Sequence, residues 1–332
     1  MSSAWWRIRW NECHRDDLAI SPRYLRYDAA LGWRTYPFLR GWPVGMGADC
    51  STNSRGLRGA EEHSYARRTG RKRLLVLGDS FAFGEEVRDE ETFSAQLERL
   101  IPGLEVINMG VGGYGDDQML LYLKEEGRRY NPDMVLLLYN ASDAKRNNIT
   151  FRDYAKPSFE FDGTGLRLIG RPVPSFRMTR LRYVLGSRLV DFLSMLYERL
   201  HPPRDRTLLL LDLIRDEASS IGARFAMFSE SGRPFQDYCR DRGVDCLTVG
   251  FADAGPLPPG YSHWPPAWHA SAARQLIPFV EAIMKRPRPG RDAALPSRLA
   301  VTRRSRGEAR PDAASPNPDK SSMGRPRFAD LY

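Results

Sequence analysis

The stretch RLLVLGDSFAFG, residues 73–84, decides how this sequence can fold. An apolar run over residues 74–77 ends abruptly in Gly-Asp-Ser at residues 78–80, and a second glycine follows at Gly84. Gly, Asp and Ser are ordinary turn residues, so a surface turn is one interpretation. The alternative is a serine held at the carboxyl edge of a parallel sheet, where open α/β folds collect their ligands.

Segments of strand and helix character alternate along the chain from residue 73 onward. Short apolar runs closed by glycine are typical of buried parallel strands, and apolar residues at helical spacing predict amphipathic helices. The strands are expected at 73–78, 104–110, 132–140, 223–230 and 244–250, and the helices at 91–101, 116–130, 206–222 and 270–285. This alternation predicts a parallel sheet covered by helices on both faces.

One segment departs from this rhythm. Residues 158–170 alternate apolar and polar side chains around Asp162-Gly163-Thr164-Gly165, which predicts a β-hairpin. The hairpin belongs to an insertion at about 150–205.

The charge of the chain is unevenly distributed. The sequence has 332 residues and a formal charge of +9. Residues 285–332 hold 12 Lys or Arg against 5 Asp or Glu, so +7 of that charge lies there. This segment is rich in Pro, Arg, Ala and Ser and is expected to be a disordered basic tail. The remainder is close to neutral, so we expect no nucleic-acid partner.

Three expected parts follow from these patterns. Residues 1–70, broken by many Gly and Pro, are expected to form an irregular lead-in packed on the core, residues 71–284 the main domain, and residues 285–332 the tail. The aromatic and basic opening residues 1–10 are expected to pack on the domain, with weak membrane contact as the alternative.

The cysteines and the hydropathy suggest an ordinary intracellular protein. The spacing of the four cysteines is neither that of CxxC pairs nor that of metal ligands; they are Cys13, Cys50, Cys239 and Cys246. We therefore expect free thiols, and we expect neither a metal nor a cofactor. No apolar run is long enough for a transmembrane helix, and no signal peptide is recognisable, so the expected compartment is the cytoplasm.

A second glycine cluster, NMGVGGYGDDQ at residues 108–118, also follows a strand and opens a helix. Gly110, Gly112 and Gly115 match the dinucleotide fingerprint literally. However, Asp116 and Asp117 open the helix where a pyrophosphate needs positive potential. Such a loop equally suits backbone N–H groups that must approach a reacting oxygen.

Of the five histidines, His263 is the candidate base for Ser80. It lies in GYSHWPPAWHASAARQL, where a Pro-rich loop enters the last helix after the final core strand. A loop there can reach the edge of the sheet at which Ser80 stands.

These residues carry a resemblance. Over roughly residues 25–284 the chain resembles the SGNH (GDSL-type) hydrolases. The similar segments are LGDSFAFGEEV (77–87), INMGVGGYGDDQ (107–118), PDMVLLLYNASD (132–143) and SHWPPAWH (262–269), with YDAALGWRTYP and STNSRGLRG upstream. The resemblance implies a three-layer α/β/α, flavodoxin-like fold, ester hydrolysis or acyl transfer on a carbohydrate or lipid, and no cofactor.

Residue roles follow from the same resemblance. Ser80 matches the nucleophile and first oxyanion donor, Gly113 the second donor, and His263 the general base. The family's third donor, an Asn, is replaced by Ser142; either Ser142 or Asn140 is expected to substitute for it.

The family's acid stands three residues before the histidine, where this chain has Gly260. Asp253, or a backbone carbonyl, is expected to orient His263 instead. Trp268 also replaces a glycine before the second histidine, His269.

Three functions are therefore considered. The first is a serine esterase, hydrolysing or transferring an acetyl or short acyl group on a small-molecule or carbohydrate ester. The second is a catalytically weakened relative that binds carbohydrate or takes part in polysaccharide modification. The third is a dinucleotide-binding oxidoreductase acting through the glycine cluster.

Overall fold

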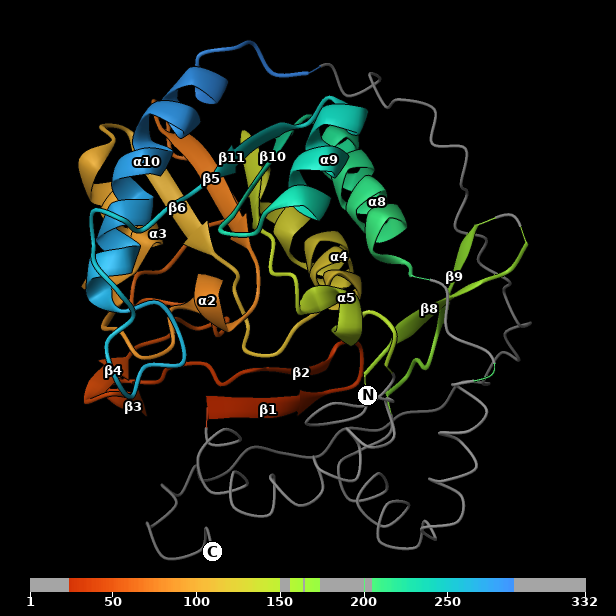
Figure 1. The fold of residues 1–332 in the computed structure, drawn as a ribbon, viewed down its shortest axis with the longest axis horizontal. Coiled ribbons are helices and arrows are strands. Elements are labelled where there is room, and N and C mark those ends of the chain that lie inside the picture. The colour runs from red at the N-terminus through yellow and green to blue at the C-terminus, as the bar shows by residue number, and fades with distance from the viewer. Residues whose placement is uncertain (1–23, 150–155, 164, 174–199, 201–204, 290–332) are drawn as a thin grey trace, which may run out of the picture. The chain divides into compact units, whose positions relative to one another are not determined.

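A five-stranded parallel sheet forms the core of the described part of the chain (Figure 1). The computed structural model describes residues 24–149, 156–163, 165–173, 200 and 205–289. The strands are β5 (Lys72–Leu77), β6 (Leu104–Asn108), β7 (Met134–Leu138), β10 (Arg224–Ser229) and β11 (Asp245–Thr248). Their order is β11-β10-β7-β5-β6. Along the chain β5 is the first strand of this sheet, and it lies between the second, β6, and the third, β7. This is the flavodoxin-like order, so the predicted fold is confirmed.

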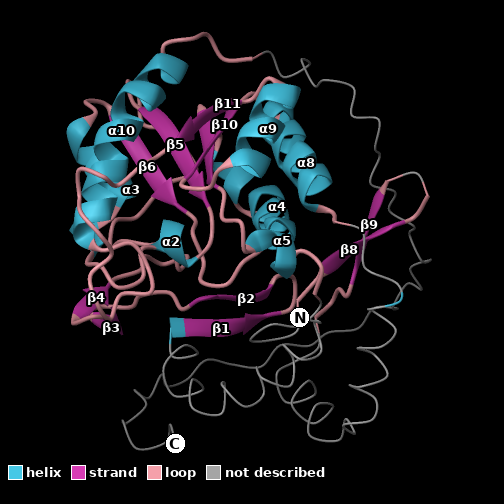
Figure 2. Cartoon of the chain, in the orientation of Figure 1, coloured by secondary structure: helices cyan, strands magenta, loops and turns pink. Residues whose placement is uncertain are grey.

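Helices cover both faces of this sheet (Figure 2). Leu75 and Leu77 point to one face, where they join a core with side chains of α4 (Asp116–Glu125), α8 (Thr207–Ser220) and α9 (Arg233–Arg242). Leu74 and Val76 point to the other, toward α3 (Phe93–Leu100) and α10 (Pro266–Met284). This alternation along one strand produces the three layers.

Among the longer helical segments, two features differ from the expectation. The helix predicted over 116–130 ends at Glu125 and continues as a separate 3₁₀ turn, η3 (Gly127–Tyr130). α9 was not predicted at all, because its sequence, RPFQDYCRDR, is mostly polar. It begins with Pro234 in its first turn and ends at Gly243, whose φ of 61° is a common helix terminus.

Where the structure describes the lead-in, residues 24–50 are regular, whereas residues 51–70 are irregular apart from an isolated bridge between Thr52 and Arg58. Residues 24–50 form two antiparallel hairpins, β1 (Leu25–Asp28) with β2 (Gly32–Thr35) and β3 (Trp42–Gly45) with β4 (Ala48–Cys50). Met46 and Gly47, between β3 and β4, both have positive φ, as tight hairpin turns require. Glycines that were interpreted as interruptions therefore close these turns.

The insertion contains the expected hairpin. β8 (Ser158–Phe161) pairs antiparallel with β9 (Leu166–Ile169). Most of the insertion and residues 290–332 of the predicted tail lie outside the described residues. None of the helices in the described part of the chain combines the length and apolar character of a membrane span.

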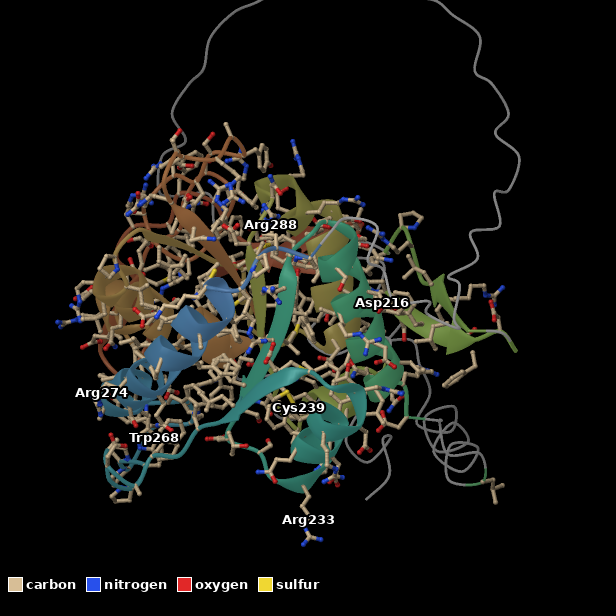
Figure 3. All side chains as sticks on the ribbon, turned by 90° about the horizontal axis from the view of Figure 1, so that it is seen from above. Asp216, Arg233, Cys239, Trp268, Arg274 and Arg288 are labelled. Carbon is tan, nitrogen blue, oxygen red and sulfur yellow. A yellow bond between two sulfur atoms is a disulfide. The ribbon has the colours of Figure 1, made fainter. Side chains whose placement is uncertain are left out.

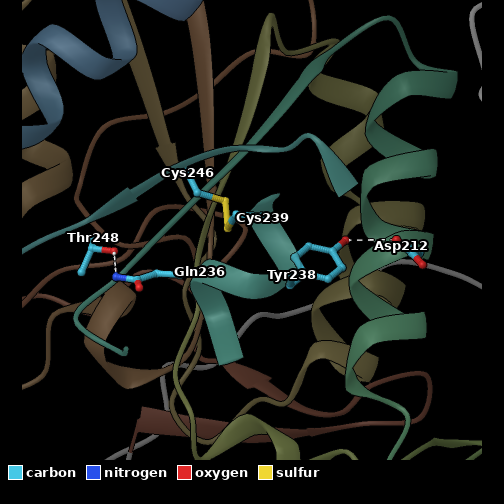
Figure 4. Close-up of a disulfide and its surroundings, with 6 residues drawn as sticks. All are labelled: Asp212, Gln236, Tyr238, Cys239, Cys246 and Thr248. Atoms are coloured by element: carbon cyan, nitrogen blue, oxygen red, sulfur yellow. Dashed lines mark hydrogen bonds between the residues drawn. A yellow bond between two sulfur atoms is a disulfide. The ribbon is translucent and has the colours of Figure 1, made fainter. Parts of the chain in front are cut away.

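The expectation of free thiols is wrong for one pair. Cys239, near the end of α9, forms a disulfide with Cys246 on β11 (Figure 4). A short connection turns at Gly243 and brings the two Cα atoms to 6.0 Å, within the range of a disulfide. Cys50 is free and buried, and burial raises the pKa of its thiol to about 11.

Candidate active site

Ser80 stands immediately beyond the carboxyl end of β5. It is the first residue of the short helix α2 (Ser80–Phe83), which Asp79 caps by accepting the Phe81 N–H at 3.0 Å. A Cβ at Gly78 would lie 2.5 Å from that of Ala82, so only glycine permits this sharp turn into α2. The Ser80 side chain is nearly buried yet faces the loop that carries His263.

His263 Nε2 lies 2.9 Å from Ser80 Oγ. The loop that holds it is fixed by its neighbour Trp264, whose indole is buried among aromatic rings and donates to Glu230 at 3.1 Å. The ring of Phe81 lies 4.9 Å from the imidazole. The structure therefore brings the predicted nucleophile and the predicted base into hydrogen-bond contact, with the packing that fixes their positions.

Two glutamates flank the imidazole. Glu86 Oε1 lies 3.3 Å from His263 Nδ1, and Glu85 Oε2 lies 3.5 Å from Nε2. Ser262 Oγ also faces Nδ1, at 3.1 Å. Sequence reasoning missed both glutamates. The only sequence feature that could have indicated them is their position in the loop GEEV, residues 84–87, directly after the Ser80 turn. Side chains in that loop can reach the edge of the sheet at which Ser80 lies.

Asp253 does not reach back to His263. Its carboxylate accepts from Ser271 Oγ at 2.5 Å and from Arg274 at 2.6 Å, both on α10. Arg274 is labelled on that helix in Figure 3. Asp253 therefore ties the preceding loop to α10, and the expectation that it orients the imidazole is wrong.

Two backbone N–H groups, in the Ser80 turn and in the loop after β6, have no acceptor among the described residues. Within the described part of the chain, neither the Ser80 N–H nor the Gly113 N–H donates a hydrogen bond. Gly113 is buried in the loop after β6, with a φ of 79° that favours glycine. That loop packs against the Ser80 segment, since Val111 N–H donates to the Gly78 carbonyl at 3.2 Å. Backbone N–H groups without an acceptor are the kind of donor that stabilises an oxyanion.

The other glycines of this cluster face protein. A Cβ at Gly110 would lie 2.3 Å from the Phe83 nitrogen, and one at Gly115 would lie 2.8 Å from Asn147 Oδ1. The space that a pyrophosphate needs beside a dinucleotide fingerprint is thus filled by α2 and by Asn147. Among the described residues, no group of three or more His, Cys, Asp or Glu side chains is arranged to hold a metal ion.

Asn140 and Ser142 both lie in the turn after β7, and they bind each other. The Ser142 hydroxyl donates to Asn140 Oδ1 at 2.9 Å, so its proton is already used. The Asn140 amide nitrogen donates one hydrogen to Asp79 at 3.2 Å and keeps a second. Of the two expected third oxyanion donors, Asn140 is thus the one that keeps a donor hydrogen within the described part of the chain.

A buried ionic network stabilises the Ser80 turn through Asp79, the residue before Ser80. Arg146 donates to Asp79 at 2.5 Å and to Asp143 at 2.7 Å. Burial raises the pKa of Asp143 well above its usual range, and the negative charge of Asp79 adds to this, whereas Arg146 opposes both. Asp79 is accordingly a structural residue of the turn.

His269, the second histidine of the last block, is a core residue. Its Nδ1 accepts the Phe93 N–H at 3.2 Å, and its ring stacks on Phe93. Burial lowers the pKa of this imidazole to about 3, so it stays neutral.

Several solved structures are similar to this chain in part. An esterase from Pseudoalteromonas is 13% identical with a TM-score of 0.42, and the match covers 65% of this chain and 100% of that one. A lipolytic protein of the G-D-S-L family from Desulfitobacterium hafniense is 12% identical with a TM-score of 0.40. That match covers 64% of this chain and 99% of the lipolytic protein. An acetylxylan esterase from Geobacillus stearothermophilus is 14% identical with a TM-score of 0.38. That match covers 64% of this chain and 96% of the esterase.

No family model and no curated protein matches the sequence. At such low identities, the activities of the structural neighbours do not transfer to this chain.

Proposed function

We propose that this chain is a serine esterase or acyltransferase in which Ser80 is the nucleophile and His263 the general base. The observation that carries the proposal is the 2.9 Å contact between Ser80 Oγ and His263 Nε2 at the carboxyl edge of the sheet. A serine hydroxyl is a weak nucleophile until an adjacent base accepts its proton. The nearly buried Ser80 and the fixed His263 loop meet this requirement.

The reaction proceeds in two steps. Ser80 Oγ attacks the ester carbonyl while its proton moves to His263 Nε2, and the same nitrogen then protonates the leaving alcohol. Water, or the hydroxyl of an acceptor, attacks the acyl-serine in the second step and gives its proton to His263, which returns it to Ser80 Oγ as the bond between the acyl carbon and Ser80 Oγ breaks. Free Ser80 and the acid, or the transferred ester, result.

The negative oxygen of each tetrahedral intermediate is stabilised by the Ser80 and Gly113 N–H groups, with the Asn140 amide as a third donor. Each such donor contributes about 10²–10³-fold to the rate. The unpaired state of both N–H groups supports this assignment.

The substrate class is part of the proposal. The resemblance to SGNH hydrolases implies an acetyl or short acyl group on a carbohydrate or lipid, and one structural neighbour is an esterase active on acetylated mannans. We expect no nucleic-acid partner.

Hydrolysis of p-nitrophenyl acetate, with mass spectrometry of the rapidly quenched protein, tests the proposal. The wild type should turn over and carry one acetyl group on the peptide that contains Ser80. Ser80→Ala should lose turnover by about 10⁴-fold or more, whereas Ser220→Ala, at an exposed serine of α8, should behave as wild type. Turnover or acylation that survives in Ser80→Ala contradicts the proposal.

A further inference from the structure

In an active serine hydrolase the base needs a group that fixes its tautomer. Nδ1 must carry the hydrogen so that the Nε2 lone pair faces the serine, and an acceptor at Nδ1 ensures this. Gly260 stands where the related enzymes have their acid, and Asp253 binds α10 instead. The structure must supply another acceptor.

The two carboxylate oxygens of Glu86 contact four atoms of this loop. Its Oε2 accepts the backbone N–H of Ser262 at 2.9 Å and that of His263 at 3.0 Å. Its Oε1 accepts the Ser262 hydroxyl at 2.6 Å and lies 3.3 Å from His263 Nδ1. Because the Ser262 hydroxyl gives its hydrogen to Glu86, its lone pairs also face Nδ1. Both oxygens beside Nδ1 therefore act as acceptors and select the Nδ1–H tautomer.

The backbone of Glu86 has a conformation that is unfavourable for a residue with a side chain. Its φ of 68° lies in the left-handed region, which a non-glycine residue seldom adopts. Such conformations persist only when the surrounding structure fixes them, and they gather at functional sites.

The lead-in provides the contacts that fix this backbone. The Glu86 N–H donates to the Val44 carbonyl of β3 at 3.0 Å. The buried guanidinium of Arg58 donates to the carbonyls of Gly84, at 2.8 Å, and Val87, at 2.7 Å, on either side of Glu86. Met46 occupies the space next to Gly260, 3.2 Å from where a Cβ would stand. The hairpin thus holds Glu86 in place and fills the space beside the usual acid position.

The ionisation of Glu86 agrees with this arrangement. Partial burial raises the pKa of the carboxyl, but the hydrogen bonds from Ser262 and His263 outweigh that effect and hold it below its usual range. Glu86 is therefore negatively charged at neutral pH.

We propose that Glu86 is the residue that orients His263, taking the place of the acid that the SGNH hydrolases carry three residues before their histidine. The proposal rests on the esterase function proposed above. When the Ser80 proton reaches Nε2, the imidazolium keeps its Nδ1 hydrogen facing Glu86 Oε1 and Ser262 Oγ. No proton passes to Glu86, whose charge stabilises the cation. Glu86 is a positioning residue and does not touch the substrate.

Glu86→Gln tests the proposal, because its amide keeps the size of the side chain but loses the charge. We expect kcat to fall by between about 10²- and 10⁴-fold with little change in KM. The acid limb of the pH profile of kcat/KM should move to lower pH, since a neighbouring negative charge favours the protonated ring. Glu85, the other carboxylate beside the ring, is kept in every variant.

Two further variants separate positioning from folding. Glu86→Asp restores the carboxylate and should recover at least about tenfold of the lost kcat. Glu90→Gln removes an exposed charge from the same segment and should match the wild type. Equal thermal stability of Glu86→Gln and Glu90→Gln shows that both are folded. An unchanged kcat and pH profile in a folded Glu86→Gln overturns the proposal.

A measurement that does not depend on catalytic activity is also needed. It distinguishes failure of the role proposed for Glu86 from failure of the esterase proposal. In ¹⁵N-histidine NMR, assigned with a His263 variant, His263 of the wild type should be the Nδ1–H tautomer, and Glu86→Gln should disturb it. A wild type without activity but with this pattern contradicts only the esterase function. An Nε2–H tautomer in the wild type, or a pattern unchanged in Glu86→Gln, overturns the role of Glu86.

Discussion

At the scale of single residues, Gly112 shows how little free space surrounds the imidazole. A Cβ on Gly112 would lie 2.3 Å from Tyr24 Oη and 2.6 Å from Glu85 Oε1. Tyr24 donates a hydrogen bond to Glu85, whose other oxygen lies 3.5 Å from His263 Nε2. The absence of a side chain at Gly112 therefore leaves room for a tyrosine–glutamate pair directly beside the base.

Gly112→Ala should displace this pair and disturb His263. We expect kcat/KM for an ester to fall by about 10- to 100-fold, because shifts of about 1 Å near reacting groups have effects of this size. Gly250→Ala is the matched control, since its Cβ would meet nothing within 4 Å. Steady-state kinetics of both variants checks the prediction, and equal activity of the two would contradict it.

Ser80 and His263 could be recognised from the sequence because each lies in a short motif at the end of a predicted strand or the start of a predicted helix. Glu86 could not be recognised in this way. It follows the nucleophile by six residues, whereas its partner lies 177 residues further on. The contact between Glu86 and His263 depends on a left-handed backbone and on hydrogen bonds from two lead-in residues, Val44 and Arg58, and none of these leaves a sequence signal. Asp253 was chosen as the nearest acid in the sequence, but nearness along the chain did not bring it to the imidazole.

At the scale of elements, the lead-in is part of the site's framework. Trp33 on β2 is fully buried, and its indole N–H donates to the Gly112 carbonyl at 2.9 Å. Gln118 of α4 donates in turn to the Leu31 carbonyl at 2.7 Å. Residues before the sheet therefore fix the loop that carries the proposed oxyanion donor Gly113.

Trp33→Ala should reduce both stability and activity. Removing a large buried side chain costs about 3–5 kcal/mol in the free energy of unfolding, and the Gly112 carbonyl loses its donor. Leu208→Ala, at a half-exposed position of α8, should change stability by only about 0.5 kcal/mol. Urea unfolding of the two variants measures the difference; similar losses would mean that the lead-in does not stabilise the core.

The elements of the sheet were predictable because burial on both faces leaves a strong apolar pattern. Two kinds of element were not. The lead-in strands are too short, at three or four residues, to show a period. α9 buries only one narrow side, with Phe235, Tyr238 and Cys239, so its other positions are free to be polar. Its disulfide to β11 depends on this unpredicted helix.

At the scale of the whole molecule, buried charges make stability depend on pH. Asp116 is fully buried at the start of α4. It accepts one hydrogen bond from Asn147 at 2.7 Å, and its other oxygen has no hydrogen-bond partner among the residues that the structure describes. Burial is the largest cause that raises the pKa of Asp116 from 3.8 to about 7, and neighbouring Asp117 adds to it.

The sign of this effect follows from proton binding. Between about pH 4 and 7 the folded chain keeps the Asp116 proton that the unfolded chain has lost, so rising pH lowers the free energy of unfolding. Asp116→Asn should gain stability relative to wild type over this window, by more than about 1 kcal/mol, because one pKa unit corresponds to about 1.4 kcal/mol. Chemical denaturation at several pH values checks this, with exposed Asp49→Asn as control. A stability difference that is independent of pH would contradict it.

The disulfide bears on where the protein acts. Disulfides persist mainly in oxidising compartments, whereas the sequence led us to expect the cytoplasm. The cytoplasm remains a prediction, and the Cys239–Cys246 disulfide favours an oxidising compartment instead.

The central claim is that Ser80 is an activated nucleophile, and labelling with a fluorophosphonate probe tests it most directly. Folded wild type should be labelled at Ser80, heat-unfolded protein should not, and both Ser80→Ala and His263→Ala should lose the label. Folded wild type that stays unlabelled, or labelling that persists in Ser80→Ala, would contradict the account.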